Sequence, residues 1–232
     1  MNTATQDQPA LSLSIVPVTP FEQNCSLLVC RRSGEAVAID PGGDLDKIDR
    51  ALARSGARMV KVLLTHGHID HCGLARDYAD RHRVALVGPH REDDFWIDQL
   101  PLQGQRFGFP PLKAFSPDRW LEQGDTVEFG EQRLAVHHTP GHTPGHVVFH
   151  HAGVGLAIVG DVLFDGSIGR SDFPRGNYKA LIASITRELW PMGAETRFVP
   201  GHGPMSTFGE QRESNPYVSD AVLGAQASTG TA

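Results

Sequence analysis

The chain has 232 residues, of which 40% are hydrophobic, and this is enough for one α/β domain with a sizeable core. The formal net charge is −6 and no long basic run occurs, which disfavours a nucleic-acid partner bound through its phosphates. No apolar run approaches the length of a membrane span, and the polar residues 1–10 lack the apolar segment of a secretory signal. The three cysteines are widely spread and suggest no disulfide framework, so we expect a cytoplasmic protein without a membrane partner.

In the first half of the chain the sequence predicts a disordered tail at residues 1–10, followed by strands and helices. Apolar and polar residues alternate or form short apolar runs in the strand candidates, and an apolar stripe marks the clearest helix. Strands are predicted at 11–16, 23–30, 35–39, 60–64 and 84–87, and helices at 45–55, 72–79 and 90–100. Residues 103–118 predict a long loop whose Phe107, Phe109 and Phe115 either line a pocket or, as we expect, cover the core.

The second half of the chain repeats this plan without repeating the residues. Strands are predicted at 125–129, 133–137, 146–151, 156–160 and 196–199, with a helix at 177–189 before the last of them. The pattern is compatible with two sheets packed face to face and helices outside. We expect one domain over residues 11–217, followed by a flexible tail at 218–232 because that segment is small and polar.

The strongest functional signal is the sequence THGHIDH at residues 65–71, between a predicted strand and a predicted helix. Imidazole and carboxylate groups are good ligands for zinc, iron and manganese. His66 and His68 alternate by two, so both can point to one side of the turn. Asp70 and His71 start the helix and point differently, which suggests a second metal position. The alternative is a solvated polar turn in which Asp70 caps the helix.

Three later strand candidates end in a similar way, with a glycine-containing turn and a metal-ligand residue. His142 follows the strand at 133–137, Asp161 follows the run at 156–160, and His202 follows the last strand. Sheet-based enzymes place their sites in loops at the carboxyl ends of strands, so these residues fit one rim of a sheet. Asp40 also ends a strand, where it either begins a turn or orients a ligand histidine from behind.

On these residues the sequence resembles the metallo-β-lactamase superfold family, and within it the hydroxyacylglutathione hydrolases (glyoxalase II) in their short bacterial form. Further marks are AIDPGG at 38–43, GSIGRSDF at 166–173 and GHGPMSTFGE at 201–210. The resemblance covers about residues 11–217 and implies an αββα sandwich of two mixed sheets with helices outside. Full-length members carry a helical C-terminal domain that supplies part of the glutathione pocket, whereas only 30 residues follow His202 here.

The resemblance also implies two divalent metal ions. It assigns His66, His68 and His142 to the first ion, Asp70, His71 and His202 to the second, and Asp161 to a bridge between them. Zinc is the first expectation, with iron or manganese as alternatives, because these donors accept all three metals. Two ions about 3.5–4 Å apart can share a water and lower its pKa toward neutrality. Asp70 is the expected catalytic residue, since it can orient the resulting hydroxide.

A thioester suits this chemistry because its leaving group is a thiolate, whose parent thiol has a pKa of about 8.5, and needs no strong acid. We therefore expect a thioester hydrolase with a small, glutathione-derived substrate, S-D-lactoylglutathione first, which yields D-lactate and glutathione. Arg170 is the candidate for binding the anionic end of the substrate, with an ion pair to Asp172 or Asp165 as the alternative. Tyr178 and Asn177 are weaker candidates for substrate contact.

Two related activities remain as alternatives. A persulfide dioxygenase shares the fold, the histidines and a segment like GRSDF at 169–173, but uses one iron. A metallo-hydrolase for another thioester is the second, and the short C-terminal region leaves room for it. A β-lactamase is disfavoured by the missing export signal, and a non-enzymatic binding protein by the fact that every motif position is filled. The sequence leaves the oligomeric state open.

Overall fold

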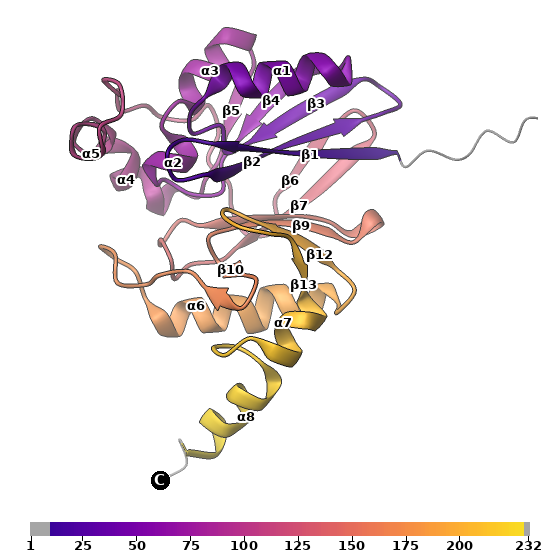
Figure 1. Ribbon diagram of the computed structural model, residues 1–232, viewed down its shortest axis with the longest axis vertical. Coiled ribbons are helices and arrows are strands. Elements are labelled where there is room, and N and C mark those ends of the chain that lie inside the picture. Colours follow the sequence, from indigo (N-terminus) through magenta and orange to yellow (C-terminus); the bar gives the residue numbers. More distant parts are fainter. Residues whose placement is uncertain (1–9, 230–232) are drawn as a thin grey trace, which may run out of the picture.

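The computed structural model describes residues 10–229, with side chains described through residue 225, and it contains two β-sheets packed face to face (Figure 1). The first sheet has the order β1-β2-β3-β4-β5, antiparallel from β1 to β3 and parallel from β3 to β5. Its strands are β1 (Leu11–Val18), β2 (Gln23–Cys30), β3 (Glu35–Ile39), β4 (Arg58–Leu63) and β5 (Ala85–Val87).

The second sheet has the order β13-β12-β9-β8-β7-β6, in which only β9 and β12 run parallel. Its strands are β6 (Thr126–Phe129), β7 (Gln132–His138), β8 (Val147–His151), β9 (Leu156–Gly160), β12 (Arg197–Pro200) and β13 (Ser206–Thr207). A separate ribbon is formed by β10 (Leu163–Phe164) and β11 (Ser167–Ile168).

Helices cover the outer face of each sheet and gather at one end of the molecule (Figure 1). The first sheet is covered by α1 (Leu45–Ser55) and α3 (Ala75–His82), and the second by α6 (Tyr178–Ser184), its π-helical extension η3 (Ile185–Leu189) and α7 (Phe208–Ser214). At the end of the molecule lie α2 (Ile69–Cys72), α4 (Asp94–Asp98) and α5 (Leu100–Phe107), while α8 (Asp220–Thr229) follows α7. Short 3₁₀ turns are η1 (Arg91–Asp93), η2 (Ala152–Val154) and η4 (Trp190–Met192).

Three separate apolar layers hold this arrangement together. β2 contributes to two of these layers, because all eight of its residues are buried and successive side chains point to opposite faces of the sheet. Leu27 packs toward the α1 and α3 layer, whereas Leu28 packs between the sheets with Phe149 of the second sheet. The third layer joins the second sheet to its helices through residues such as Leu181 and Phe198. These three layers confirm the expected αββα sandwich.

The structure departs from the predicted elements in several places; the helix predicted at 90–100, for example, is divided into η1, α4 and the start of α5. The helix predicted at 72–79 is two helices, α2 and α3, and α5 occupies the start of the expected loop at 103–118. In that loop Phe109 and Phe115 pack against the core as expected, whereas Phe107 is exposed and lines a cavity. α8 gives a helical conformation to part of the expected flexible tail, and the mobility of that segment stays a prediction. Nearly all of the tail expected at 1–10 lies outside the described residues. No described helix is long and apolar enough to cross a membrane.

Candidate metal centre

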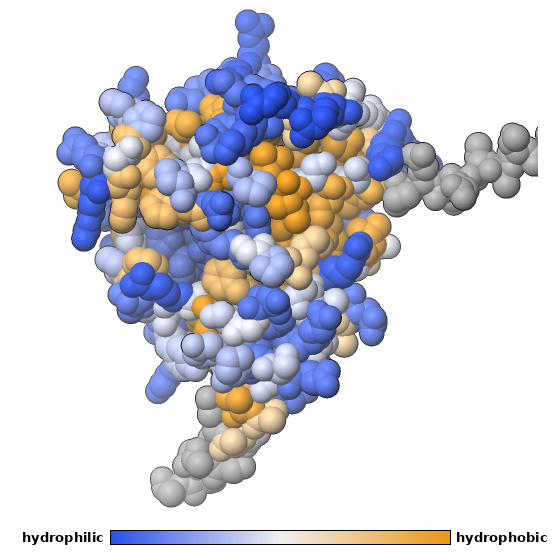
Figure 2. Space-filling view, viewed as in Figure 1, coloured by the Kyte–Doolittle hydropathy of each residue, from blue (hydrophilic) through white to orange (hydrophobic). Residues whose placement is uncertain are grey.

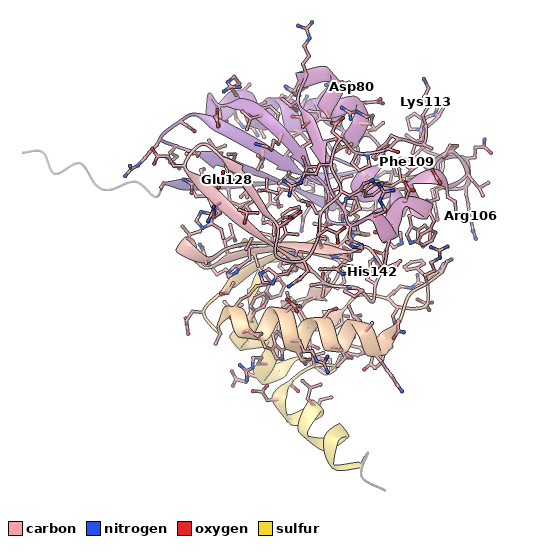
Figure 3. The ribbon with its side chains drawn as sticks, turned by 180° about the vertical axis from the view of Figure 1, so that it is seen from behind. Asp80, Arg106, Phe109, Lys113, Glu128 and His142 are labelled. Atoms are coloured by element: carbon pink, nitrogen blue, oxygen red, sulfur yellow. The ribbon has the colours of Figure 1, made fainter. Side chains whose placement is uncertain are left out.

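The predicted ligand residues come together at the end of the sandwich where the parallel strands have their carboxyl ends. The loop after β4 carries the HxHxDH motif, the loop between β7 and β8 carries His142, and Asp161 and His202 directly follow β9 and β12. Figure 3 shows His142 between the two halves of the molecule. Ligand residues from both sheets therefore meet at one place, as the sequence predicted.

Three of these histidines form a first cluster. The Nδ1 atom of His68 lies 3.1 Å from Nε2 of His66 and 3.0 Å from Nε2 of His142. All three rings are buried. Burial lowers the pKa of His68 to about 3, so its ring is neutral at pH 7 and can offer a lone pair to a cation. The cluster thus presents three imidazole nitrogens to one point.

The second cluster consists of Asp70, His71 and His202, and Asp161 lies between the two clusters. Nε2 of His202 is 3.1 Å from the Asp70 carboxylate, and Nε2 of His71 is 3.8 Å from it. One oxygen of Asp161, Oδ1, lies 3.3 Å from Nε2 of His71. The other, Oδ2, lies 3.5 Å from Nε2 of His142 and 3.7 Å from Nε2 of His202. Asp161 therefore contacts members of both clusters at once.

The outer ring nitrogens show which atoms the histidines turn toward the centre. Thr65 Oγ1 donates to Asp40 Oδ2 at 2.6 Å, so at 3.0 Å it accepts from Nδ1–H of His66. Three other histidines donate their outer N–H in the same way: His71 to Asp40 at 2.9 Å, His142 to the Arg170 carbonyl at 2.7 Å, and His202 to the Phe21 carbonyl at 3.1 Å. Because these protons are outside, the inner nitrogens carry lone pairs, as metal-binding histidines require.

Two buried atoms at the centre test whether a cation fits. Nε2 of His71 and Oδ1 of Asp161 are buried and have no hydrogen-bond partner, although they face each other at 3.3 Å. A nitrogen lone pair beside a carboxylate oxygen is unfavourable unless a proton or a cation lies between them. A metal ion would satisfy both groups. The donor set and these two atoms therefore fit a site for two metal ions.

The loop after β3 supports the second cluster from behind, as its sequence AIDPGG predicted. Asp40 accepts from the backbone N–H of Thr65 at 2.7 Å as well as from His71, so its interpretation as an orienting residue is confirmed. Gly42 presses directly on the ligand loop, since a Cβ built there would lie 1.7 Å from the carbonyl oxygen of Asp70. Only glycine permits this approach of the two loops.

Two supporting residues have roles that the sequence did not indicate. Asp93 is fully buried and accepts from the backbone N–H groups of Gly67 at 2.8 Å and Gly145 at 2.6 Å, and from the Thr143 hydroxyl at 2.7 Å. It thereby joins the two loops that carry the first cluster, although burial raises its pKa to about 6. His146 accepts from the backbone N–H of Asp161 at 3.1 Å, which fixes the strand end behind the bridging residue.

A cavity of about 750 Å³ opens over both clusters. Arg170 lines it, and its guanidinium is paired with Asp172 through Nε at 2.9 Å and Nη2 at 2.8 Å. The predicted substrate contact and the alternative ion pair are therefore both compatible with its position. Tyr178 and Asn177 lie outside the cavity lining, because Asn177 caps α6 by accepting from the Ala180 N–H. Their role in substrate binding stays a prediction.

This fold and this cluster of ligands define the class of protein. The family model of the metallo-beta-lactamase superfamily matches residues 18–202, so the chain belongs to that superfamily. Hydroxyacylglutathione hydrolase GloC of Haemophilus influenzae is 40% identical to it over 209 residues, which cover 90% of this chain and 98% of the relative.

Two solved structures have the same fold at similar sequence identity. The B3 metallo-beta-lactamase BLEG-1 is 32% identical, with a TM-score of 0.82 over 89% of this chain and 99% of its own. The protein TTHA1623, solved in a di-iron-bound form, is 33% identical, with a TM-score of 0.77 over 88% of this chain and 100% of its own. The two neighbours carry different descriptions, so the fold alone does not fix the substrate.

Proposed function

We propose that this protein is a metal-dependent thioester hydrolase that cleaves S-D-lactoylglutathione to D-lactate and glutathione. The observation that carries the proposal is the position of Asp161, whose carboxylate contacts both clusters. This is the arrangement needed to hold two ions close together. In this proposal the first ion would be held by His66, His68 and His142 and the second by Asp70, His71 and His202, with the Asp161 carboxylate available to both. The relative named hydroxyacylglutathione hydrolase supports the choice of a glutathione thioester.

The chemistry divides between the metal ions and the side chains. When bound, two divalent ions lower the pKa of a shared water and polarise the substrate carbonyl, with zinc as the first expectation and iron or manganese as alternatives. Asp70 borders the cavity, so its carboxylate can accept a hydrogen bond from that water and hold it toward the carbonyl carbon. Burial excludes bulk water from His66, His68, His71 and His142. The thiolate leaving group needs no protonation by an acid, and we assign none.

Arg170 is the proposed contact for the anionic half of the substrate. Its pair with Asp172 uses Nε and Nη2, which leaves Nη1 outside the pair and able to donate to a carboxylate. The guanidinium lies 4.4 Å from the ring centroid of Phe173, which restricts where it can move. The backbone of Arg170 also accepts from His142, so the proposed contact is linked directly to a cluster histidine.

The test is hydrolysis of S-D-lactoylglutathione by the purified protein, together with its metal stoichiometry. We expect close to two metal ions per chain, and loss of both activity and one or more ions in His68→Ala. His82→Ala is the matched control, because that histidine pairs with Asp49 outside the clusters and should leave both readouts unchanged. Ordinary turnover in His68→Ala or after complete metal removal would refute the mechanism. A single iron with oxygen uptake on glutathione persulfide would instead support the dioxygenase alternative.

A further inference from the structure

Many of the large apolar side chains that are exposed to solvent line the cavity over the two clusters. Six large apolar side chains are exposed among the described residues, and three of them, Phe21, Leu102 and Phe107, line this one cavity. Leu102 is 64% exposed and Phe107 is 50% exposed, so neither is needed to fill the core. Figure 2 shows apolar surface over the region of α5 in the same view as Figure 1. Apolar side chains concentrated at a cavity are typical of a ligand-binding surface.

Part of this apolar lining lies beside His202. The carbonyl of Phe21 accepts from His202, and the ring of Phe164 lies 6.4 Å from the His202 ring. The Phe21 ring contacts Phe107 edge to face at 5.9 Å, which connects the end of α5 to the turn between β1 and β2. An apolar wall, which we define as Phe21, Leu102, Phe107 and Phe164, therefore lines the cavity, and its members Phe21 and Phe164 border the second cluster.

The opposite side of the cavity has a different character. Phe173 contacts the rings of His68 at 4.9 Å and His142 at 5.7 Å, so it borders the first cluster. Arg170 lies over the outer face of Phe173. The cavity thus has Arg170 beside the first cluster and the apolar wall beside the second, with the guanidinium of Arg106 lying 5.9 Å from the Phe107 ring of that wall. A thioester carbonyl placed at the clusters would have one substituent directed to each side.

We propose that the apolar wall receives the acyl group of the substrate, and that this hydrolase prefers thioesters with an extended apolar acyl chain. The inference rests on the proposed thioester hydrolysis and narrows its substrate class. The glutathione half lies toward Arg170, where its carboxylates find a cation, and the acyl chain lies along α5. Transfer of methylenes from water to this wall favours binding in proportion to the apolar area covered. A methylene enclosed in a hydrophobic pocket typically changes kcat/KM by about tenfold or more. Because Leu102 and Phe107 are largely exposed, the wall covers the acyl chain on one side only, and we expect about this gain from the whole chain.

The experiment compares two glutathione thioesters that differ only in acyl length, S-acetylglutathione and S-hexanoylglutathione, on the metal-loaded protein. We expect kcat/KM to be about tenfold or more higher for the hexanoyl substrate. Leu102→Ser and Phe107→Ser should each lower the hexanoyl-to-acetyl ratio by roughly tenfold, mainly through KM, which corresponds to about 1.4 kcal/mol. Gln105→Ser is the matched control, because Gln105 is exposed on the same helix but does not line the cavity.

Each outcome decides the inference. A wild-type protein that cleaves S-D-lactoylglutathione but shows no preference for the hexanoyl substrate would overturn the acyl wall and leave the proposed function standing. A wild-type protein with two bound metals that cleaves none of the three thioesters would refute the proposed function, and the inference would fall with it. If Gln105→Ser lowered the ratio as much as Leu102→Ser, α5 would act through its fold rather than through its apolar contacts, which also overturns the proposal.

Discussion

Asp93 offers a quantitative test of how the ligand loops are held. Its Oδ2 accepts from Gly67 and Thr143 and its Oδ1 accepts from Gly145, so Asp93→Asn turns one acceptor into an NH₂ donor. At least one buried donor then loses its acceptor, at a cost of about 1–3 kcal/mol. Loss of the buried charge recovers part of this cost, because burial already raises the pKa of Asp93 to about 6. We expect a net destabilisation of about 2 kcal/mol.

The assay is thermal unfolding at fixed protein and zinc concentrations, since bound metal adds to the apparent stability. For a chain of this length each kcal/mol lowers the melting temperature by about 2–4 °C, so Asp93→Asn should melt about 4–8 °C below the wild type. Thr143→Val removes one donor and leaves the carboxylate with its two backbone partners, so we expect roughly half of that decrease. Zinc content measured on the same samples reports whether the first cluster still assembles.

An Asp93→Asn protein that melts within about 1 °C of the wild type with full metal content would refute this reasoning. Such a result would mean that the two loops keep their positions without the carboxylate. If Thr143→Val melted at the wild-type temperature and Asp93→Asn did not, the Thr143 hydroxyl would be shown to contribute no stability, and the role of the Asp93 carboxylate would stand.

Three further predictions concern residues outside the ligand set. Asp40→Asn should weaken metal binding about 10–100-fold, because the new amide no longer fixes the N–H of His71, and competition with a chelator measures the change. Gly42→Ala should destabilise the protein and lower its metal content, because its Cβ would collide with the Asp70 carbonyl; thermal unfolding and metal analysis report both. The pKa of Asp118 is lowered by its hydrogen bond from a backbone N–H, so the ionised carboxylate stabilises the folded state. This stabilisation is fully present above the unfolded pKa of about 3.9 and is lost as pH falls through the lower pKa of the folded state. Asp118→Asn should therefore lower the urea midpoint more at pH 7 than at pH 3.

Each of these predictions has a result that contradicts it. Unchanged chelator competition in Asp40→Asn would show that His71 is oriented by other contacts. A Gly42→Ala protein with wild-type stability and metal content would show that the two loops can separate freely. An equal effect of Asp118→Asn at both pH values would show that the carboxylate charge does not contribute to stability.

The sequence predicted the ligand residues because their chemistry is local. Histidines and aspartates in short turns after apolar strands have few structural uses, so residue type and position together indicated metal binding. The apolar runs predicted the individual strands and were compatible with two packed sheets, whereas the αββα sandwich was implied by the resemblance to the metallo-β-lactamase family. α1 was predicted with its correct bounds, because its apolar stripe is regular and Gly56 ends it in a left-handed conformation.

Asp93 and α5 show what the sequence did not reveal. Asp93 lies in an acidic stretch that looks like the start of a solvated helix, and its partners Gly67 and Gly145 are 26 and 52 residues away. α5 contains Gly104 and starts next to a proline, so its sequence resembles a loop. Gly104 is tolerated there because the backbone packs closely on Leu112. Both features depend on tertiary contacts that local patterns do not record.

The division of the ligand residues between the two sheets has a consequence for assembly. The HxHxDH loop belongs to the first half of the chain, whereas His142, Asp161 and His202 all belong to the second. In the proposed assignment neither half contains a complete donor set for either ion, so metal binding would require one half to be docked on the other. Metal content during refolding would then follow the last step of tertiary assembly, and a chain whose halves dock out of place would be distinguished by its failure to retain metal against a weak chelator.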